Sequence, residues 1–264
     1  MNNNSASDIL WETWQSGSVI EELPQPIRPQ SRIAGYEIQS TLEARSAKPL
    51  YGWKIAATSV AGQKHIGVDG PMAGRILAEQ VREQGGAIDL ANNRMLVAEC
   101  EFAFKMGHDL PPRKAPYMTD EVLAAVASLH PAIEVPDSRY RAFETVGAAQ
   151  LIADNACAHL FMLGSKTTAN WRAMDLAQHA VTATMQNKGG PLVHHHGIGS
   201  NVLGDPRIAL CWLANELSGL GITLKAGEVI TTGTCVIPMA IKPGDDLRAS
   251  FGAIGEISAQ FVLA

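Results

Sequence analysis

The chain has 264 residues, of which 46% are hydrophobic and 18% are charged, and its formal net charge is −5. This composition suits a globular protein with a sizeable core, and the lack of any run of Lys or Arg argues against a nucleic-acid partner. No apolar stretch reaches the roughly 18 residues that a membrane-spanning helix needs, so we expect no membrane partner either.

The first residues and the cysteines favour a cytoplasmic protein. The N-terminal sequence has neither the basic residues nor the apolar stretch of a signal peptide. The four cysteines lie apart inside apolar segments and form no Cys-x-x-Cys pair, which is typical of small core residues in a reducing compartment.

Residues 1–75 are predicted to form an N-terminal helical and α/β part. Residues 1–32 have apolar residues at helical spacing and then three prolines, which indicates a helical arm followed by a loop. An amphipathic helix is expected over 33–46 and a strand over 50–58. A short helix follows at 59–66, capped by Thr58 or Ser59.

The middle of the chain contains three acidic residues in apolar surroundings. Glu99 and Glu101 lie two apart in a strand predicted over 94–106, and Glu134 lies in a second apolar strand around 131–136. Helices are predicted over 119–129 and 144–155, on either side of this second strand.

These acidic residues predict a metal site. Side chains two apart on a strand point to the same side, so Glu99 and Glu101 emerge together. Two buried carboxylates repel each other unless one is protonated or a cation lies between them. With Glu134, and without a nearby Cys or imidazole ligand, they suit a hard divalent cation, Mg²⁺ or Mn²⁺. A solvated strand face or a row of ion pairs is the alternative.

From residue 157 onward the pattern is mostly β. One predicted helix, 206–219, interrupts the strands, and turn signals lie at 225–228 and 242–245. The chain is therefore predicted to be mixed α/β with many non-local strands, and not a regular βαβ alternation. The expected strands are 157–163, 179–187, 192–196, 228–237 and 256–263.

Two further motifs have structural interpretations. His194 and His196 share one face of a predicted strand, as zinc ligands do, but no third ligand has a suitable spacing. We interpret this tract as a solvated or interface strand. The sequence from Gly197 to Val202 lacks the third glycine and the βαβ unit of a dinucleotide-binding loop, so we reject that site.

Short segments along most of the chain point to one protein family. They are GWKI at 52–55, IGVD at 66–69, AECEFAF at 98–104, DLP at 109–111, PAIEV at 131–135, ADNA at 153–156, VLGDP at 202–206, ANEL at 214–217 and AGEVITTGT at 226–234. In number and order they resemble the 2-oxopent-4-enoate hydratase and 4-oxalocrotonate decarboxylase family of the fumarylacetoacetate hydrolase superfamily. The resemblance runs from about residue 25 to the C-terminus.

The resemblance implies a β-rich roll around the site with helices outside, and residues 76–264 as the catalytic domain. It also implies that Glu99, Glu101 and Glu134 hold Mg²⁺ or Mn²⁺ and that Lys54 lies near the substrate. Family members are oligomers, so a homo-oligomer is expected. A complex with a related decarboxylase or hydratase is a further predicted association.

The function that the resemblance implies is a lyase, a metal-dependent hydratase. It would add water to a 2-hydroxy-2,4-dienoate and give a 4-hydroxy-2-oxoacid in the catabolism of aromatic compounds. The oxoacid end of such a substrate chelates the cation, which acts as a Lewis acid. The alternatives are a 4-oxalocrotonate-type decarboxylase, a C–C hydrolase of acylpyruvate type, and a non-catalytic subunit. The hydrolase would need a His–Glu pair on a short helix, which the sequence after Lys54 lacks.

Lys54 is the predicted catalytic residue, as a proton shuttle or as a charge that positions the substrate. Burial in its apolar segment would lower its pKa. A lysine that extends to solvent is the alternative interpretation. His65 follows this segment and could lie near the pocket mouth, although a surface histidine is expected.

Four more residues are candidates for substrate binding. Asp154 and Asn155 close a predicted helix and could contact the substrate, although a helix cap is the alternative. Thr234 could offer its hydroxyl and backbone N–H to the substrate carboxylate, and Gly233 would allow that close approach. A strand-end turn is the alternative for this pair.

Two positions depart from the family pattern. Met72 follows the Val68-Asp69-Gly70-Pro71 segment, where hydratases and decarboxylases often have an acidic residue, and Cys157 stands where many members have serine. Both segments are expected near the pocket. A less polar pocket would favour a bulkier or more apolar substrate tail.

Overall fold

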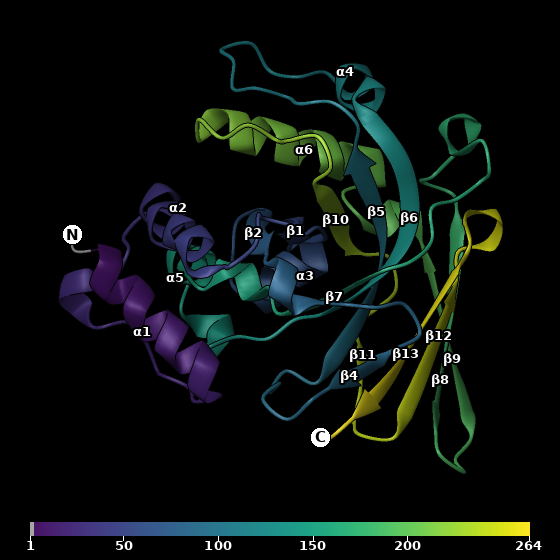
Figure 1. Cartoon of the computed structure of the whole chain (residues 1–264), viewed down its shortest axis with the longest axis horizontal. Helices are drawn as coiled ribbons and strands as arrows, with labels where there is room; N and C mark the ends of the chain where they lie inside the picture. Colours follow the sequence, from purple (N-terminus) through teal and green to yellow (C-terminus); the bar gives the residue numbers. More distant parts are fainter. Residues whose placement is uncertain (1–2) are drawn as a thin grey trace.

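Two β-sheets form the centre of the protein, seen here in a computed structural model that describes residues 3–264 (Figure 1). The larger sheet has eight strands, one of which, β11 (Met239–Ala240), pairs with β5 outside the main path. The main path runs β2 (Met72–Ile76), β1 (Gly52–Ala56), β10 (Val229–Thr234), β5 (Val97–Met106), β6 (Val126–Val135), β7 (Leu160–Leu163) and β3 (Val81–Arg82).

The second sheet has five strands. Its order is β4 (Ala87–Asp89), β13 (Glu256–Val262), β12 (Asp245–Ser250), β8 (Ala180–Asn187) and β9 (Leu192–Ile198). Buried and exposed residues alternate along β8, β12 and β13, as expected of strands with one face on the core and one in water. The core joins both sheets: the rings of Phe102 in β5 and Phe251 after β12 lie 5.1 Å apart, edge to face.

The helices lie outside the sheets. They are α1 (Asn3–Ser16), α2 (Arg32–Ser40), α3 (Val60–His65), α4 (Thr119–Ala124), α5 (Ala148–Ala153) and α6 (Pro206–Gly219). In Figure 1, α1, α2 and α5 gather on one side of the larger sheet, and the second sheet extends on the other. Side chains cap several helix starts, among them Ser59 for α3 and Asp205 for α6.

Much of the predicted organisation is confirmed. The mixed α/β class with curled sheets and outer helices is as expected, and so are the N-terminal helical arm and the helix over 206–219. Ser59, one of the two predicted caps, accepts a hydrogen bond from the N–H of Gly62. The two turn signals hold glycines in left-handed conformation, with φ of 87° at Gly227 and 92° at Gly244.

Several predicted boundaries are wrong. The helix predicted over 119–129 ends at Ala124, because β6 begins at Val126 and its residues pair with β5. The helix predicted over 33–46 is α2 followed by a 3-10 helix over Thr41–Arg45. The helix predicted over 144–155 is mainly α5, with short 3-10 turns before and after it. The strand predicted from 157 begins at Leu160.

Five strands were missed, namely β2, β4 and β12 and the two-residue strands β3 and β11. In β2, Gly74 and Arg75 interrupt the apolar pattern that would predict a strand. The predicted division at residue 75 stays a prediction, and that residue lies inside β2. Within residues 3–264, no helix combines the length and apolar character needed to cross a bilayer.

Candidate active site

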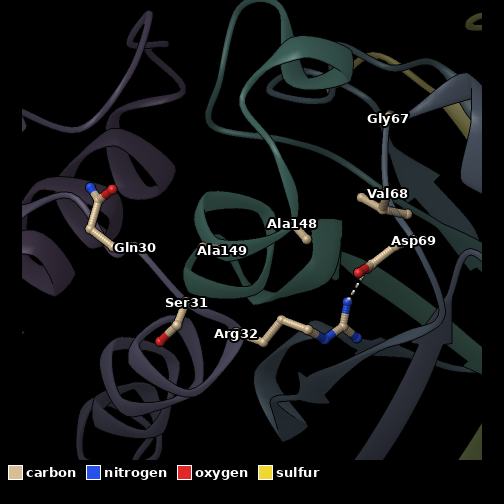
Figure 2. Close-up of a pocket in the computed structure, with 8 residues that line it drawn as sticks. All are labelled: Gln30, Ser31, Arg32, Gly67, Val68, Asp69, Ala148 and Ala149. Atoms are coloured by element: carbon tan, nitrogen blue, oxygen red, sulfur yellow. Dashed lines mark hydrogen bonds and ion pairs between the residues drawn. The ribbon is translucent and has the colours of Figure 1, made fainter.

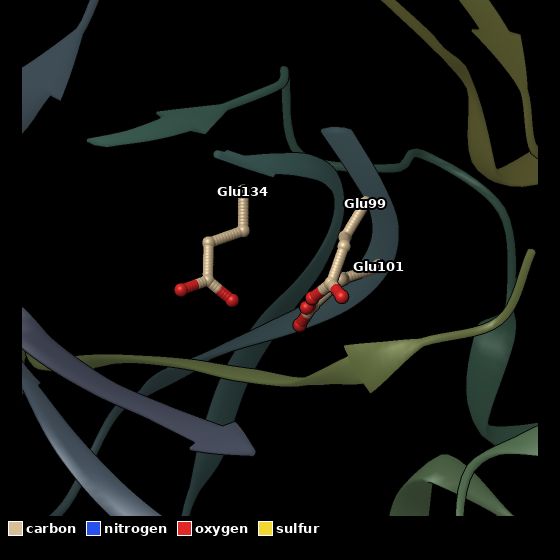
Figure 3. A group of neighbouring side chains, drawn as sticks. All are labelled: Glu99, Glu101 and Glu134. Carbon is tan, nitrogen blue, oxygen red and sulfur yellow. The ribbon is translucent and has the colours of Figure 1, made fainter. Parts of the chain in front are cut away.

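The pairing of β5 with β6 brings the three predicted acidic residues together. The two strands are antiparallel, and Glu99 lies directly opposite Glu134. Glu101 is two residues further along β5, on the same side. One carboxylate oxygen from each of the three lies within 4.8 Å of the other two (Figure 3). We call Glu99, Glu101 and Glu134 the carboxylate cluster.

Lys54 reaches the carboxylate cluster from β1, two strands away from β5. Its Nζ lies 3.1 Å from Oε1 of Glu134 and donates a hydrogen bond of 3.2 Å to the carbonyl of Ala156. The residue is only 3% exposed. Lys54 is therefore a buried partner of the acids, and the alternative of a lysine that extends to solvent is excluded.

Glu101 is fixed by one of its two carboxylate oxygens. Its Oε2 accepts hydrogen bonds from the hydroxyl of Thr231 and from the N–H of Gly233, the latter at 2.7 Å. A register shift in β10 between Thr231 and Thr234 makes both contacts possible. Gly233 has φ of 97°, and the side chain of Thr58 lies where a Cβ would be, so only glycine fits there.

Burial and mutual repulsion raise the pKa values of the acids. Burial, and then the charge of Glu134, raise the pKa of Glu99 to about 7, and Lys54 opposes this shift. The pKa values of Glu101 and Glu134 are also raised, in both cases chiefly by burial. Without a cation, the fully ionised form of the carboxylate cluster is therefore disfavoured.

The prediction that burial lowers the pKa of Lys54 is wrong for this structure. Burial does act in that direction, but the negative charges of Glu134, Glu99 and Glu101 outweigh it and raise the pKa above its usual value. The expectation considered only the apolar neighbours in the sequence. The acids that reverse the shift come from β5 and β6, far away along the chain.

The carboxylate cluster fits a divalent cation. Oε1 of Glu101 and Oε2 of Glu134 are buried and have no hydrogen-bond partner among the described residues, and Oε1 of Glu134 has only the ion pair with Lys54. Three carboxylates against one ammonium leave two negative charges without compensation. Buried charges of this kind are costly unless paired, and an all-oxygen set of three carboxylates is what a hard divalent cation prefers. Glu99 is partly exposed, so the cluster meets solvent on that side.

The other predicted residues lie nearby, but their polar atoms bind the protein. The carboxylate of Asp154 accepts hydrogen bonds from the hydroxyl of Ser138 and from Arg139. The amide of Asn155 binds the backbone of Arg75. Their role in substrate binding stays a prediction.

The predicted carboxylate-binding pair is also engaged. The hydroxyl of Thr234 donates to the carbonyl of Val236, and the N–H of Gly233 donates to Glu101. Contact of Gly233 and Thr234 with a substrate therefore stays a prediction as well. The alternative of a strand-end turn matches their position at the end of β10.

Two contributors to the site were missed from the sequence. One is the hydroxyl of Thr231, which holds Glu101, and the other is the carbonyl of Ala156, which holds Lys54. A threonine directly before Thr-Gly-Thr has no distinctive spacing, and a carbonyl carries no residue signal at all. The pairing of β10 with β5 reveals the first, and the contact of the turn Asn155–Cys157 with β1 and β2 reveals the second.

The histidines lie outside the carboxylate cluster. The ring of His65 contacts Phe143, with ring centres 6.3 Å apart. His194, His195 and His196 lie on β9, the edge strand of the second sheet, which is largely exposed. In the described part of the chain, β9 is therefore a solvent-facing edge strand, as the prediction of a solvated or interface strand allows.

The residues that depart from the family pattern are both buried. Met72 begins β2 and is fully buried. Burial, and then the charge of Asp154, raise the pKa of the Cys157 thiol to about 12, so the group is a neutral thiol near neutral pH. The predicted preference for a more apolar substrate tail stays a prediction.

A surface cleft of about 430 Å³ lies between the start of α2, the loop after α3 and the start of α5 (Figure 2). Arg32 and Asp69 bridge it, with 3.3 Å between Nη1 and Oδ1. Neither Lys54 nor any member of the carboxylate cluster lines this cleft. The ion pair is exposed and contributes little stability.

Comparison with known proteins gives a consistent result. Residues 46–262 match the family described as fumarylacetoacetate (FAA) hydrolase C-terminal. The chain is 31% identical over 259 residues to a 2-keto-4-pentenoate hydratase of Paraburkholderia xenovorans, which covers 97% of this chain and 93% of the relative. It is 33% identical over 223 residues to a 2-hydroxyhexa-2,4-dienoate hydratase of Comamonas testosteroni, covering 83% and 81%.

A solved structure has a closely similar fold. The 4-oxalocrotonate decarboxylase from Pseudomonas putida G7, complexed with magnesium and adipate, superposes with a TM-score of 0.85. The two chains are 25% identical, and the match covers 98% of this chain and 96% of the decarboxylase.

Proposed function

Because the chain belongs to the hydratase and decarboxylase family of the fumarylacetoacetate hydrolase superfamily, we propose that it is a metal-dependent hydratase of 2-hydroxy-2,4-dienoates. The product is a 4-hydroxy-2-oxoacid. One observation carries the proposal: a buried cluster of three glutamates with a lysine, in a chain 31% identical over 97% of its length to a hydratase of this type. A role in the catabolism of aromatic compounds belongs to the same proposal.

The three residues of the carboxylate cluster would hold the cation. Their oxygens without hydrogen-bond partners support this role, and so does the magnesium in the structure of the decarboxylase. When bound, Mg²⁺ supplies Lewis-acid stabilisation of negative charge at the oxoacid end of the substrate. We propose Mg²⁺ first and Mn²⁺ as the alternative, because both are hard cations that accept three carboxylates.

Lys54 holds a proton at Nζ beside the carboxylate cluster. In the reaction, the 2-hydroxyl gives up its proton and the terminal carbon, C5, takes one up. Water then adds its OH to C4, and its remaining proton goes to C3. Nζ lies 3.1 Å from Glu134 and is enclosed by protein, so it can move a proton at the oxoacid end. Thr231 and Gly233 keep Glu101 in one orientation while this happens.

A decarboxylase of 4-oxalocrotonate type is the second candidate. The fold match to such an enzyme, with a TM-score of 0.85 over 98% of this chain, favours it. Both reactions would use the carboxylate cluster and Lys54. The hydratase ranks first because the relatives with more than 30% identity are named hydratases.

The test supplies the purified protein and Mg²⁺ with 2-hydroxypenta-2,4-dienoate and, separately, with 4-oxalocrotonate. We expect loss of the dienol absorbance with the first substrate, no release of CO₂ with the second, and loss of activity after treatment with EDTA. Release of CO₂ without hydration would favour the decarboxylase. Activity that persists after complete metal removal would contradict both.

A homo-oligomer, or a complex with a related decarboxylase or hydratase, belongs to the same proposal. The exposed edge strand β9, with Leu192 and Val193 about half exposed, is a surface on which another chain can pair. Light scattering on the purified protein is expected to give a mass above that of one chain, and a monomer at micromolar concentration would exclude the homo-oligomer.

A further inference from the structure

The segment after α5 has an unusual backbone. Asn155, Ala156 and Cys157 have φ of 57°, 49° and 61°, so three successive residues adopt the left-handed conformation and none of them is glycine. Such residues persist only where the surrounding structure holds them, and they concentrate at functional sites. The contacts that hold this segment therefore indicate what it is for.

The amide of Asn155 fixes the segment to β2. Its Oδ1 accepts a hydrogen bond of 2.6 Å from the N–H of Arg75, and its Nδ2 donates one of 2.8 Å to the carbonyl of the same residue. Since β2 is the edge strand of the larger sheet, this amide binds the backbone groups that a further strand would bind. Asn155 is only 1% exposed.

Arg139 holds the segment from both ends. Its Nε binds the carboxylate of Asp154, and its Nη1 donates to the carbonyl of Ala158 at 3.2 Å. The backbone N–H of Arg139 also donates to Asp154, at 3.0 Å. Both ends of the segment and Asn155 are thus fixed, which constrains the direction of the Ala156 carbonyl.

That direction is toward Lys54. The carbonyl of Ala156 accepts the hydrogen bond from Nζ at 3.2 Å. Gly74 lies beneath the left-handed segment and the lysine side chain: a Cβ there would be 2.3 Å from the carbonyl oxygen of Asn155 and 3.1 Å from Cγ of Lys54. The left-handed segment and the lysine side chain thus pack on the same point of β2.

The geometry points to Asn155 as a positioning residue for Lys54, which acts through the carbonyl of Ala156 without touching the substrate. Glu134 and this carbonyl occupy two of the three N–H donors of the ammonium. Under the proposed function, the third would donate to an oxygen of the substrate. This inference rests on the proposed function for the role of Lys54 and adds how that lysine is oriented.

The principal variant is Asn155→Gly. Glycine adopts the left-handed conformation without strain but cannot bind Arg75, so the variant removes only the side-chain contacts. We expect kcat to fall about 10- to 100-fold with KM within about threefold, because a displaced Nζ affects the reaction more than binding. If the glycine variant fails to fold, Asn155→Asp, which keeps the acceptor for Arg75, is expected to show the same pattern to a smaller degree.

Asn215 offers a matched control. Its amide binds both backbone groups of Tyr117, accepting at 2.7 Å and donating at 3.0 Å, and it lies on α6 outside the site. Asn215→Ala therefore removes an equivalent pair of contacts elsewhere. We expect it to lower the unfolding temperature and leave kcat unchanged.

A double-mutant cycle with Lys54→Met tests whether Asn155 acts through Lys54. If Asn155 acts through Lys54, then Asn155→Gly has no further effect on the residual kcat of Lys54→Met, within about twofold. Effects that multiply would show an independent role and overturn the inference. So would a folded Asn155→Gly variant with the kcat of the wild type.

A readout without substrate separates this inference from the proposed function. We would measure the rate at which formaldehyde and cyanoborohydride methylate Lys54, by mass spectrometry of the peptide that contains it. The rate is expected to rise several-fold in Asn155→Gly and to stay at the wild-type value in Asn215→Ala. If the methylation rate rises in Asn155→Gly but the wild type has no hydratase activity, only the proposed function is refuted. An unchanged rate would refute the positioning role whatever the activity.

Discussion

Lys54 and the three glutamates hold one another in an arrangement that none of them would favour alone. The lysine is buried, and its charge is retained because three carboxylates surround it. The acids in turn have raised pKa values because burial disfavours their charged forms and one ammonium does not offset this. A divalent cation would complete the charge balance. Substitution of any of these side chains would leave buried charges uncompensated.

Replacing Lys54 by methionine tests its catalytic role. Methionine keeps the length of the side chain and removes the proton at Nζ, so we expect kcat to fall about 100- to 10,000-fold. Circular dichroism and Mg²⁺ affinity serve as controls and are expected to be retained. Turnover equal to that of the wild type would contradict the catalytic role of Lys54.

Thr231 is expected to affect metal binding although it does not reach the cation. Its hydroxyl holds Oε2 of Glu101, which leaves Oε1 for the metal. We predict that Thr231→Val weakens Mg²⁺ binding about 10- to 100-fold, as is typical for residues that orient a ligand. Thr231→Ser keeps the hydroxyl and is expected to bind like the wild type. Calorimetry showing equal affinities for both variants would contradict this role.

At the scale of residues, the sequence allowed the acids and the lysine to be predicted but not their environment. Glu99 and Glu101 stand out because they alternate in an apolar strand. The direction of the pKa shift of Lys54 was missed because the acids responsible lie far away in the chain. The left-handed conformation of Asn155 was missed because no glycine marks it.

At the scale of elements, the site depends on the register between β5 and β6. Glu99 faces Glu134 across the two strands, and a slip by one residue would turn Glu134 to the other face of the sheet. Sequence periodicity identifies each strand but does not give this register, because strand pairing is non-local. The helix predicted over 119–129 failed for the same reason, since its last residues pair with β5 in β6.

The docking of α1 gives a prediction about pH. Trp14 in α1 donates a hydrogen bond of 2.9 Å to Nδ1 of His159, and burial followed by the charge of Arg139 lowers the pKa of this histidine to about 3. The unfolded chain, with a pKa near 6.5, therefore takes up a proton first as the pH falls. The contribution of His159 is complete above pH 6.5 and is lost progressively below it.

Between pH 7.5 and 5.5, this linkage amounts to about 1.4 kcal/mol of unfolding free energy. The measurement is urea unfolding at both pH values for the wild type and for His159→Asn, which keeps an acceptor but does not titrate. We expect the wild type to lose up to about 1.4 kcal/mol more than the variant. Equal losses in the two proteins would rule out this role for His159.

At the scale of the whole molecule, the metal and the fold are coupled. The carboxylate cluster joins β5 and β6 in the middle of the larger sheet, and Lys54 adds β1, so a cation bound there stabilises the sheet as a unit. A ligand at 100 times its Kd stabilises the native state by about 2.7 kcal/mol. For a chain of this length, this corresponds to a rise in Tm of about 5–10 °C.

We therefore predict that saturating Mg²⁺ raises the Tm of the EDTA-treated wild type by this amount. Glu134→Gln is expected to abolish most of the rise, while the control Asn215→Ala keeps it from a lower starting Tm. A rise of equal size in Glu134→Gln would mean that the cation stabilises the protein from another site.

The most direct measurement is isothermal titration of Mg²⁺ into the EDTA-treated protein, combined with the hydration assay on the same samples. We expect one Mg²⁺ per chain in the wild type, with hydration of 2-hydroxypenta-2,4-dienoate restored as the site fills, and both lost in Glu101→Gln and Glu134→Gln. Wild-type affinity for Mg²⁺ in these variants, or hydration by a metal-free wild type, would contradict the assignment of the carboxylate cluster.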